Sequence, residues 1–423
     1  MGTLDKVKGL VENPPKEYRS APFWGWNDRL QKENLGEQIE GFKKAGMGGF
    51  FIHSREGLET EYLSTEWMED VKFCVDKARE NDLELWIYDE DKWPSGAAGG
   101  KVSRVNPAEF TARALTMECG KAGELAVPAK LSNEEERTVT GDSDSIICGG
   151  NRSTDENFMS GRNGSEDLAV EETMETEFLQ GVYVIQTAAD GRFIKRMKEY
   201  LTYEEAAGAC GVDEEILLLR QEISGKSEWY NGLMPPDNLN PESVKTFLKL
   251  THEHYEEVFG GSFPKEVKGF FTDEPNCCDF FSVFHEGRPW IPWSIGFTEY
   301  FIEKRGYDPQ EKLPYLFFDG EGAEKIRHDY WKTVAQRFEE SYMKQVYEWC
   351  DKRGLRTTGH ILYENDLGYQ TRVCGAAMPQ LRYLHNPGID LLGAQTDEYL
   401  TVKQCASVAH QYERSMTISE AYG

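Results

Sequence analysis

Two apolar runs in this chain end in acidic residues. The stretch FFTDEP at 270–275 delivers the adjacent carboxylates Asp273 and Glu274, and the run MTISE ends at Glu420. Cleavage of a glycosidic bond requires two carboxyl groups that flank the bond, one protonated and one ionised. Like charge from Asp273 and a wall of aromatic residues are expected to raise the pKa of Glu274. Glu274 is therefore the better candidate acid, although Glu420 could instead be the acid. For either glutamate taken alone, a surface position facing water is as much expected as a catalytic role.

Further polar and aromatic residues stand at or near the ends of apolar runs. Sugar sites combine aromatic faces with hydrogen-bonding groups, so these positions are candidates for substrate binding. These residues could instead have structural roles. Aromatic residues in strands belong to the core more often than to a binding site, and single histidines are usually structural. The candidate set is Trp24, Trp26, Asn27, His53, Asp89, Glu90, Trp93, Asp273, His360 and Tyr422.

The patterns typical of metal sites are weak. The run YDEDKWPSG contains three successive carboxylates, Asp89, Glu90 and Asp91, but it lacks the spacing of a calcium loop. His252 and His254 stand two residues apart, so a helix would not present both rings on one face, and a zinc site is not expected. Nine cysteines at scattered spacings indicate reduced thiols, with no disulfide framework.

The elements that must position these residues alternate between short apolar runs and amphipathic stretches of helical period. Ser64 or Thr65 is expected to cap the helix that follows the second run. The seven predicted strands are APFWGWN, GGFFIHSR, LELWIYDED, EVKGFFT, LRTTGHIL, IDLLGAQ and SMTISEAYG.

Alternating strands and helices predict a parallel sheet, and strands that are apolar throughout predict that both of its faces are covered. A doubly wound sheet and a (β/α)8 barrel share this pattern. Functional-looking side chains at the ends of many different strands favour the barrel. No GxGxxG follows the first strand, which weakens the dinucleotide-binding alternative. A closed barrel needs eight strands, so we expect a TIM-type α/β barrel that lacks its last strand in this chain.

The repeating pattern stops after WPSGAAGG and resumes near PESVKTF. Between them, TARALTMEC, GVYVIQTA and EILLLRQEIS are predicted strands, and an acidic stretch poor in large apolar groups is predicted to be a flexible loop. We therefore expect three strand and helix units of the barrel over 1–100, an inserted β-rich subdomain over 101–236, and strands four to seven over 237–423.

Composition restricts the partners. The formal net charge of −27 over 423 residues opposes binding to nucleic acid. The N-terminal sequence lacks the features of a secretory signal, and no run of eighteen apolar residues is present, so we expect a soluble cytoplasmic protein with no membrane partner. Its oligomeric state is not fixed by the sequence.

Several long stretches in one order resemble glycoside hydrolase family 106, the α-L-rhamnosidases. They include PFWGWN, GMGGFFIHSREGLETEYLSTEWM, IYDEDKWPSGAAGG, KGFFTDEP, TTGHILYEN, NPGIDLL and SVAHQYERSMTISEAYG. The resemblance implies a (β/α)8 catalytic domain followed by β-rich domains, inversion at the anomeric carbon, and a calcium ion at the sugar. By motif, Glu274 corresponds to the acid, and Glu420 or Glu364 to the base or to a calcium ligand. Family members continue past SEAYG, so this chain resembles a truncated member.

The leading hypothesis is thus a glycosidase that acts on a terminal α-L-rhamnosyl or similar deoxy-sugar residue, with carbohydrate as its partner. A glycosidase of other specificity, such as a glucuronidase or galactosidase, is the second. The third is an inactive truncated barrel that only binds carbohydrate, since a missing strand leaves two unpaired edges.

Overall fold

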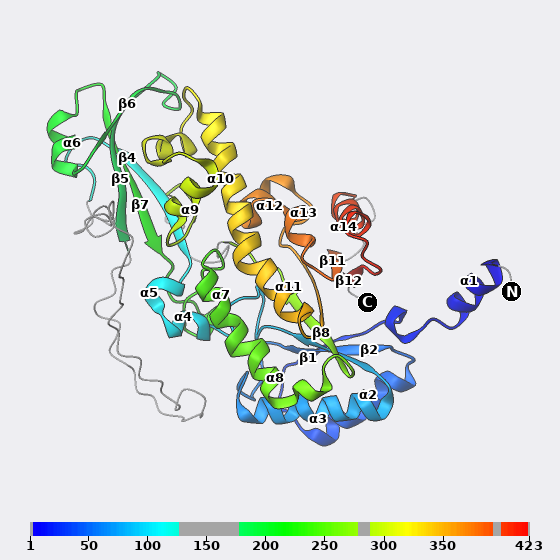
Figure 1. Cartoon of the computed structure of the whole chain (residues 1–423). Helices are drawn as coiled ribbons and strands as arrows, with labels where there is room; N and C mark the ends of the chain where they lie inside the picture. Colours follow the sequence, from blue (N-terminus) through cyan, green and yellow to red (C-terminus); the bar gives the residue numbers. More distant parts are fainter. Residues whose placement is uncertain (1–2, 127–176, 278–287, 392–398, 422–423) are drawn as a thin grey trace, which may run out of the picture.

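A computed structural model shows how these elements are arranged (Figure 1). It describes residues 3–126, 177–277, 288–391 and 399–421. The chain forms one parallel sheet of seven strands and one antiparallel sheet of five strands. In the described ranges, no helix has the length and apolar character needed to cross a membrane.

The parallel sheet contains all seven of the strands predicted from the alternating pattern. Their spatial order follows the chain, so each strand pairs with the next one in sequence within this sheet. The strands are β1 (Phe23–Trp26), β2 (Gly49–Ser54), β3 (Glu84–Tyr88), β8 (Val267–Asp273), β10 (Arg356–His360), β11 (Asn386–Leu391) and β12 (Ile418–Ala421). Every pair is parallel, which places all of their carboxyl ends at one edge of the sheet.

The sheet curls as a half-barrel with helices on its outer face. Among the described residues, β1 and β12 are its two edges and do not pair with each other. The architecture agrees with the expected incomplete barrel, and the (β/α)8 type stays a prediction.

The strands β2 and β3 have apolar residues on both faces, for the reason the sequence indicated. Phe50 and Ile52 belong to the main core, which they share with the helices. Phe51, between them, belongs to a second cluster with Trp86, Tyr88 and Phe271. Because successive side chains of a strand point to opposite faces, the second cluster lies inside the curl.

The helix α3 (Thr65–Asn81) illustrates how the outer layer forms. Ser64 is its N-cap, and the Ser64 side chain accepts a hydrogen bond of 3.2 Å from the backbone N–H of Trp67. Its buried stripe includes Val71 and Cys74, and Trp67 packs edge-on against Trp26 of β1, with ring centroids 5.0 Å apart. Ser64, one of the two predicted caps, is therefore confirmed as the N-cap of this helix.

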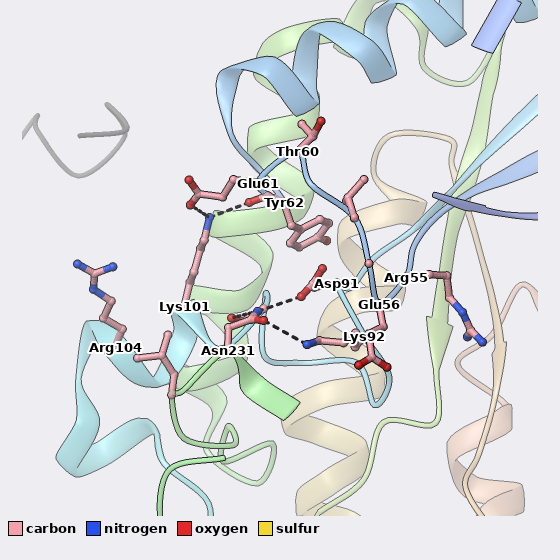
Figure 2. A pocket seen from close by; sticks show the side chains of 14 residues that line it. Arg55, Glu56, Thr60, Glu61, Tyr62, Asp91, Lys92, Lys101, Arg104 and Asn231 are labelled. Carbon is pink, nitrogen blue, oxygen red and sulfur yellow. Dashed lines mark hydrogen bonds and ion pairs between the residues drawn. The ribbon is translucent and has the colours of Figure 1, made fainter. Parts of the chain in front are cut away.

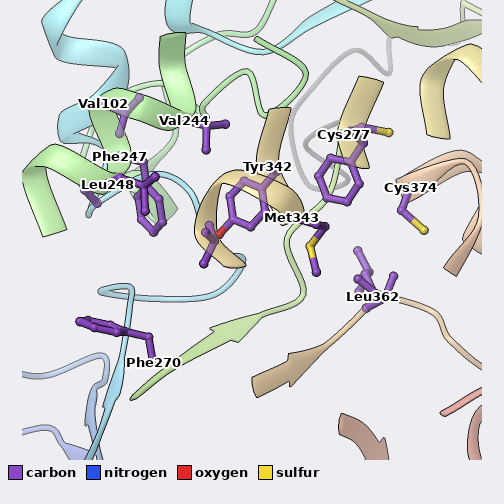
Figure 3. Packing of buried hydrophobic residues seen from close by; sticks show 14 of the residues in the cluster. Val102, Val244, Phe247, Leu248, Phe270, Cys277, Tyr342, Met343, Leu362 and Cys374 are labelled. Carbon is purple, nitrogen blue, oxygen red and sulfur yellow. The ribbon is translucent and has the colours of Figure 1, made fainter. Parts of the chain in front are cut away.

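The remaining helices are distributed around the two sheets, except α1, which projects away from them in Figure 1. Two nearly continuous helical rods, α7 with α8 and α10 with α11, are each joined by a π-helical turn, over Lys249–Glu253 and Glu339–Met343. Figure 3 shows Phe247 of α7 and Tyr342 of the second π-helical turn, whose rings stack with centroids 6.0 Å apart. The helices are α1 (Thr3–Glu12), α2 (Lys32–Lys44), α4 (Lys101–Val105), α5 (Pro107–Phe110), α6 (Tyr203–Ala209), α7 (Pro241–Leu248), α8 (His254–Phe259), α9 (Phe297–Arg305), α10 (Ala323–Phe338), α11 (Lys344–Asp351), α12 (Leu367–Cys374), α13 (Ala377–Leu381) and α14 (Leu400–Gln411).

The antiparallel sheet occupies most of the predicted insertion. Its spatial order is β6-β5-β7-β4-β9, with β4 (Arg113–Gly120), β5 (Glu177–Thr187), β6 (Ile194–Tyr200), β7 (Glu215–Ile223) and β9 (Trp290–Trp293). The sequence analysis missed β6, whose residues are mostly charged, and β9, which follows the parallel strand β8. The edge strand β9 therefore joins the insertion from outside 101–236. The acidic stretch predicted to be a flexible loop lies outside the described residues.

Candidate active site

The register of the parallel sheet brings acidic residues and one histidine together at its carboxyl edge. His360 at the end of β10 lies opposite Asp273 at the end of β8. Asp390 on β11 lies opposite Glu420 on β12. Because paired residues of neighbouring parallel strands share a face, each pair presents its side chains on one side of the sheet. We call Asp273, Glu274, His360, Asp390 and Glu420 the acidic cluster.

His360 is the centre of this cluster. Its Nε2 lies 3.0 Å from Oε2 of Glu420 and 3.2 Å from Oδ1 of Asp273. Burial acts to lower the pKa of His360, but the hydrogen bonds to Asp273 and Glu420 outweigh it and hold that pKa well above its usual value. The imidazole is therefore a cation that donates to both carboxylates.

Asp273 is the ionised partner of that cation. Burial acts to raise the pKa of Asp273, but the hydrogen bond and the positive charge of His360 bring it below the usual value. The hydroxyl of Tyr88 also donates to its Oδ2, at 2.5 Å. Ser95 fixes the backbone: its N–H donates to the Asp273 carbonyl, and its Oγ accepts from the Asp273 N–H, both at 2.8 Å. Side chain and backbone are thus both held at the end of β8.

Glu274 differs from its neighbour in charge and in backbone conformation. Burial, followed by the charge of Asp273, raises the pKa of Glu274 to about 8. Its φ of 46° lies in the left-handed region, which residues other than glycine seldom adopt and which is frequent at functional sites. A ligating oxygen of Glu274 lies within 4.8 Å of ligand atoms of His360 and Asp390. The chain turns there and holds a protonated carboxyl against the cluster.

Glu364 and Asp390 form a second buried acidic pair. The backbone N–H of Asp390 donates to Oε1 of Glu364 at 2.6 Å. Burial raises the pKa of Glu364 to about 7 and that of Asp390 to about 6. The Oδ1 of Asp390 is buried and has no hydrogen-bond partner in the part of the chain that the structure describes. Asp390 is a site residue that the sequence analysis missed, although an acid inside the apolar run GIDLL was a usable signal.

His53 of β2 interacts electrostatically with Asp273 of the cluster. Its ring stacks on Tyr88 with centroids 3.7 Å apart. Burial, which outweighs the charge of Asp273, lowers the pKa of His53 to about 3, so the ring is neutral. The Nη1 of Arg55 lies 3.3 Å from His53 Nε2 and donates to it. The two predicted histidines, His53 and His360, thus flank the same acid with different charges.

Glu90 has a structural role that its prediction as a substrate-binding residue did not foresee. It is fully buried, and its Oε2 accepts hydrogen bonds from the backbone N–H groups of Gly96, Ala97 and Ala98. Its Oε1 accepts two more, from Gly99 and Asp91. Both oxygens are occupied, so Glu90 shapes the loop after β3 and has no donor or acceptor left for a sugar.

Asp89 and the tryptophans also differ from the expectation. Asp89 is fully buried, and its Oδ1 accepts a hydrogen bond of 2.6 Å from Ser95. Trp24 and Trp26 are 8% and 2% exposed and lie in the main core, on the face that packs against the helices. Aromatic residues at alternate positions share a face, and in β1 that face is the outer one. These three residues therefore support the site without facing it.

Three further candidates lie at or beyond the edge of the described cluster. Asn27 is exposed after β1. Trp93 is half-buried, and its carbonyl accepts a hydrogen bond of 2.5 Å from the indole of Trp229. Tyr422 lies outside the described residues.

The donor set fits a divalent cation. In the described ranges, two groups of three residues place ligand atoms within 4.8 Å of one another: Asp273, His360 and Glu420, and Glu274, His360 and Asp390. Carboxylate oxygens are the ligands that Ca²⁺ prefers, and the orphaned Oδ1 of Asp390 would gain a partner from a cation. His360 is the least suitable member, because its raised pKa keeps it protonated. Glu420, one of the two predicted ligands, belongs to a group, whereas Glu364 belongs to neither.

Comparison with known proteins adds a fold relationship. No family model and no curated protein matches the chain. Among solved structures, it is similar to a rhamnosidase from Novosphingobium sp. PP1Y, with a TM-score of 0.59 and 15% sequence identity. The match covers 98% of this chain and 53% of the rhamnosidase chain, so this chain spans about half the length of that protein. At this identity the likeness establishes a shared fold.

Proposed function

We propose that this chain is a glycoside hydrolase of the family 106 type, acting on a terminal α-L-rhamnosyl or similar deoxy-sugar residue. The observation that carries the proposal is the contrast between two glutamates that both lie against His360. The pKa of Glu274 is raised to about 8, while the carboxylate of Glu420 accepts a hydrogen bond from the His360 cation. Pairs of carboxyl groups in such different environments are typical of acid and base pairs in glycosidases. The likeness in fold to a rhamnosidase agrees with this proposal.

Glu274 acts as the general acid in this proposal. With a pKa of about 8, it holds its proton at neutral pH and donates it to the glycosidic oxygen as the bond to the anomeric carbon breaks. The neighbouring Asp273 stays ionised through His360 and Tyr88, and its negative charge opposes loss of the proton from Glu274. The two adjacent carboxyls therefore have different tasks.

Glu420 is the proposed base, because the His360 cation holds its carboxylate at the edge of the curl. An inverting mechanism would have this carboxylate take a proton from the water that attacks the anomeric carbon on the face opposite the leaving group. Glu364 is the second candidate for this role. Its raised pKa of about 7 leaves it partly protonated at neutral pH, and its Oε1 already accepts a hydrogen bond from the Asp390 backbone, so it is less available to accept a proton.

Calcium is part of this proposal through the resemblance to family 106. Asp390, which belongs to one of the two groups and whose buried Oδ1 has no hydrogen-bond partner among the described residues, is the residue best placed to hold it. Bound there, the ion would supply positive charge that orients sugar hydroxyls.

The acid role is tested by the substitution Glu274→Gln, which keeps the side-chain shape and removes the proton donor. We expect kcat/KM on an aryl α-L-rhamnoside to fall by about 10²- to 10⁴-fold, the usual contribution of a general acid or base. Glu253→Gln is the matched control, because Glu253 is exposed and distant in sequence from the cluster. Normal turnover by Glu274→Gln would end the assignment.

The substrate class and the stereochemistry need separate measurements. A panel of aryl α-L-rhamnoside, β-D-glucuronide and β-D-galactoside separates the rhamnosidase from the other specificities. The first anomer released, observed by proton NMR, distinguishes inversion from retention. Hydrolysis of the glucuronide alone would replace the rhamnosyl specificity and leave the acid role of Glu274 intact.

A further inference from the structure

A cavity of about 380 Å³ lies beside the acidic cluster and has no part in the mechanism proposed above. It is formed by the loop after β2, the loop after β3, the start of α4 and the segment around Asn231 (Figure 2). Ligand pockets typically have volumes of about 300 to 1,000 Å³, so the cavity is large enough for a small ligand. Its lining includes Glu61, Tyr62, Asp91, Lys92, Lys101 and Asn231.

The cavity opens at the same edge of the sheet as the acidic cluster. Ser54, the last residue of β2, donates a hydrogen bond of 2.7 Å to Asp91 in the cavity wall. Arg55 also lines the cavity, yet its guanidinium extends to His53, which stacks on Tyr88 beside Asp273. Arg55 is thus connected to Asp273 of the cluster through two further side chains, His53 and Tyr88. A ligand anchored in the cluster would extend along Arg55 towards the cavity.

The cavity wall has the composition of a polar recognition site. It contains both cationic and acidic side chains, and Tyr62 adds an aromatic ring. Four cations, Arg55, Lys92, Lys101 and Arg104, face three acids, Glu56, Glu61 and Asp91, in a chain whose net charge is −27. Arg104 makes no ion pair with any described residue. Donors and acceptors in near-equal number suit the hydroxyl groups of a sugar, and the small excess of cations accommodates a carboxylate on it.

Much of the wall is fixed in advance. Asn231 adopts a left-handed φ of 57°, and its amide donates to Asp91 at 2.9 Å and to the Gly99 carbonyl at 3.1 Å. Lys92 donates to the Asn231 carbonyl oxygen Oδ1 at 3.1 Å, and Lys101 donates to the Tyr62 carbonyl at 2.8 Å. Interactions that pre-exist in the free protein reduce the entropy lost on binding.

We propose that this cavity is a leaving-group subsite, which binds the pyranose unit to which the cleaved deoxy-sugar is attached. The proposal rests on the proposed glycosidase function, and it adds that the natural substrate is at least a disaccharide. Arg55 lies between the two sugar positions and is expected to contact both.

The test compares a substrate that cannot fill the cavity with substrates that can. The small one is 4-nitrophenyl α-L-rhamnoside, and the larger ones are a rhamnosyl-glucose and a rhamnosyl-glucuronic acid disaccharide. Lys92→Ala removes one polar group from the wall, and Leu233→Trp fills part of the volume. We expect the ratio of kcat/KM for a disaccharide to that for the aryl rhamnoside to fall at least tenfold in both variants, mainly through KM.

Lys245→Ala is the matched control, because Lys245 lies on the exposed face of α7 and pairs only with Glu242 among the described residues. It should leave the ratio within twofold of the wild-type value. If Leu233→Trp melts well below the wild type, Lys92→Ala decides alone. Selective loss with only one of the two disaccharides still supports the subsite and identifies the sugar as neutral or acidic.

Two results would overturn the inference, and they differ from failure of the proposed function. An unchanged ratio in Lys92→Ala, with normal cleavage of the aryl rhamnoside, removes the subsite and leaves the glycosidase. An unchanged ratio in a Leu233→Trp variant that melts like the wild type does the same. A wild-type protein that cleaves none of the glycosides would overturn the function itself.

Discussion

The imidazole Nε2 of His360 lies 3.0 Å from Oε2 of Glu420, although 60 positions separate the two residues in the chain. His360 ends β10 and Glu420 lies on β12, so the contact reaches across the intervening strand β11. The same Nε2 is 3.2 Å from Asp273 on β8. One side chain thus connects the ends of three strands, and its hydrogen bond and charge lower the pKa of Asp273.

Replacement of His360 by Gln should lower stability in a pH-dependent way. The pKa of His360 is raised in the folded protein. Its contribution to the free energy of unfolding is therefore fully present below its unfolded pKa of about 6.5 and is lost as pH rises through its folded pKa. The pKa of Asp273 is lowered in the folded protein. Its contribution to the free energy of unfolding is therefore present above its unfolded pKa of about 3.8 and is lost as pH falls through its folded pKa. The destabilisation should therefore be largest between about pH 4 and 6.5 and smaller on either side.

Urea unfolding of the wild type and His360→Gln at a series of pH values measures this difference. His410→Gln is the control, because His410 is an exposed residue of α14. A constant difference between wild type and His360→Gln from pH 4 to 10 would show that His360 contributes by packing and not by charge.

The raised pKa of Glu274 predicts the alkaline limb of activity. If Glu274 donates the proton, kcat/KM should fall tenfold per unit of pH above its pKa of about 8, whereas protonation of the base governs the separate acid limb. His360 lowers the pKa of Glu274 by its positive charge, so His360→Gln should move this limb to higher pH. A pH profile of kcat/KM with an aryl rhamnoside measures both effects, and a limb that stays in place in the variant would contradict the coupling.

Glu274 should also shape the dependence of stability on pH. A carboxyl whose folded pKa is raised contributes stability at low pH, which is lost as pH rises from about 4.5 to about 8. Glu274→Gln removes this dependence, so the variant should gain stability over the wild type progressively across that window. Thermal melting at pH 4.5 and pH 8.5 tests the prediction, and equal shifts at the two pH values would contradict it.

The sequence was sufficient to predict the frame of the site. Apolar runs that end in acid predicted where β8 and β12 end, and the parallel arrangement placed Asp273, Glu274 and Glu420 at one edge. These inferences depend on local pattern and on a general property of parallel sheets, both of which a single sequence contains.

The roles of individual side chains were harder to predict, because they depend on which face and which neighbours a residue has. Trp24 and Trp26 share a face, as expected, but only the direction of curl decides that this face is the outer one. Glu90 looks like a rim carboxylate until the loop folds back and places five backbone N–H groups around it. Asp390 becomes a site residue only through its register with Glu420.

Glu90→Gln should be strongly destabilising even though glutamine has the same shape. The two carboxylate oxygens of Glu90 accept five backbone hydrogen bonds, and an amide would turn one acceptor into a donor that faces N–H groups. Hydrogen bonds to charged groups contribute about 1.5–3 kcal/mol each, so we expect a loss of the order of 3 kcal/mol or more in the free energy of unfolding. Chemical denaturation measures the loss, with Glu253→Gln as control.

Amide hydrogen exchange gives the same prediction a local readout. Protection should decrease first in residues 96–99, whose N–H groups bind Glu90. A loss of protection spread evenly over the sheet, with no excess in this loop, would contradict the anchoring role.

Adding a single methyl group at Gly359 should disrupt the contact between His360 and Asp273. Gly359 precedes His360 on β10 and adopts a φ of 142°, which side chains disfavour, and a Cβ there would lie 1.9 Å from the Thr272 carbonyl oxygen. Thr272 is its partner in the β8–β10 register and precedes Asp273. Gly359→Ala must therefore separate the two strands that hold His360 against Asp273.

We expect Gly359→Ala to lower the melting temperature and to remove aryl rhamnosidase activity even in protein that remains folded. Gly261→Ala is the matched control, because a Cβ at Gly261 meets nothing within 4 Å and its φ is not in the left-handed range. The control separates the general effect of replacing glycine from the effect of separating β8 and β10. Since the strand contact fixes the distance between His360 and Asp273, a folded Gly359→Ala variant with wild-type activity would show that this distance does not govern the chemistry.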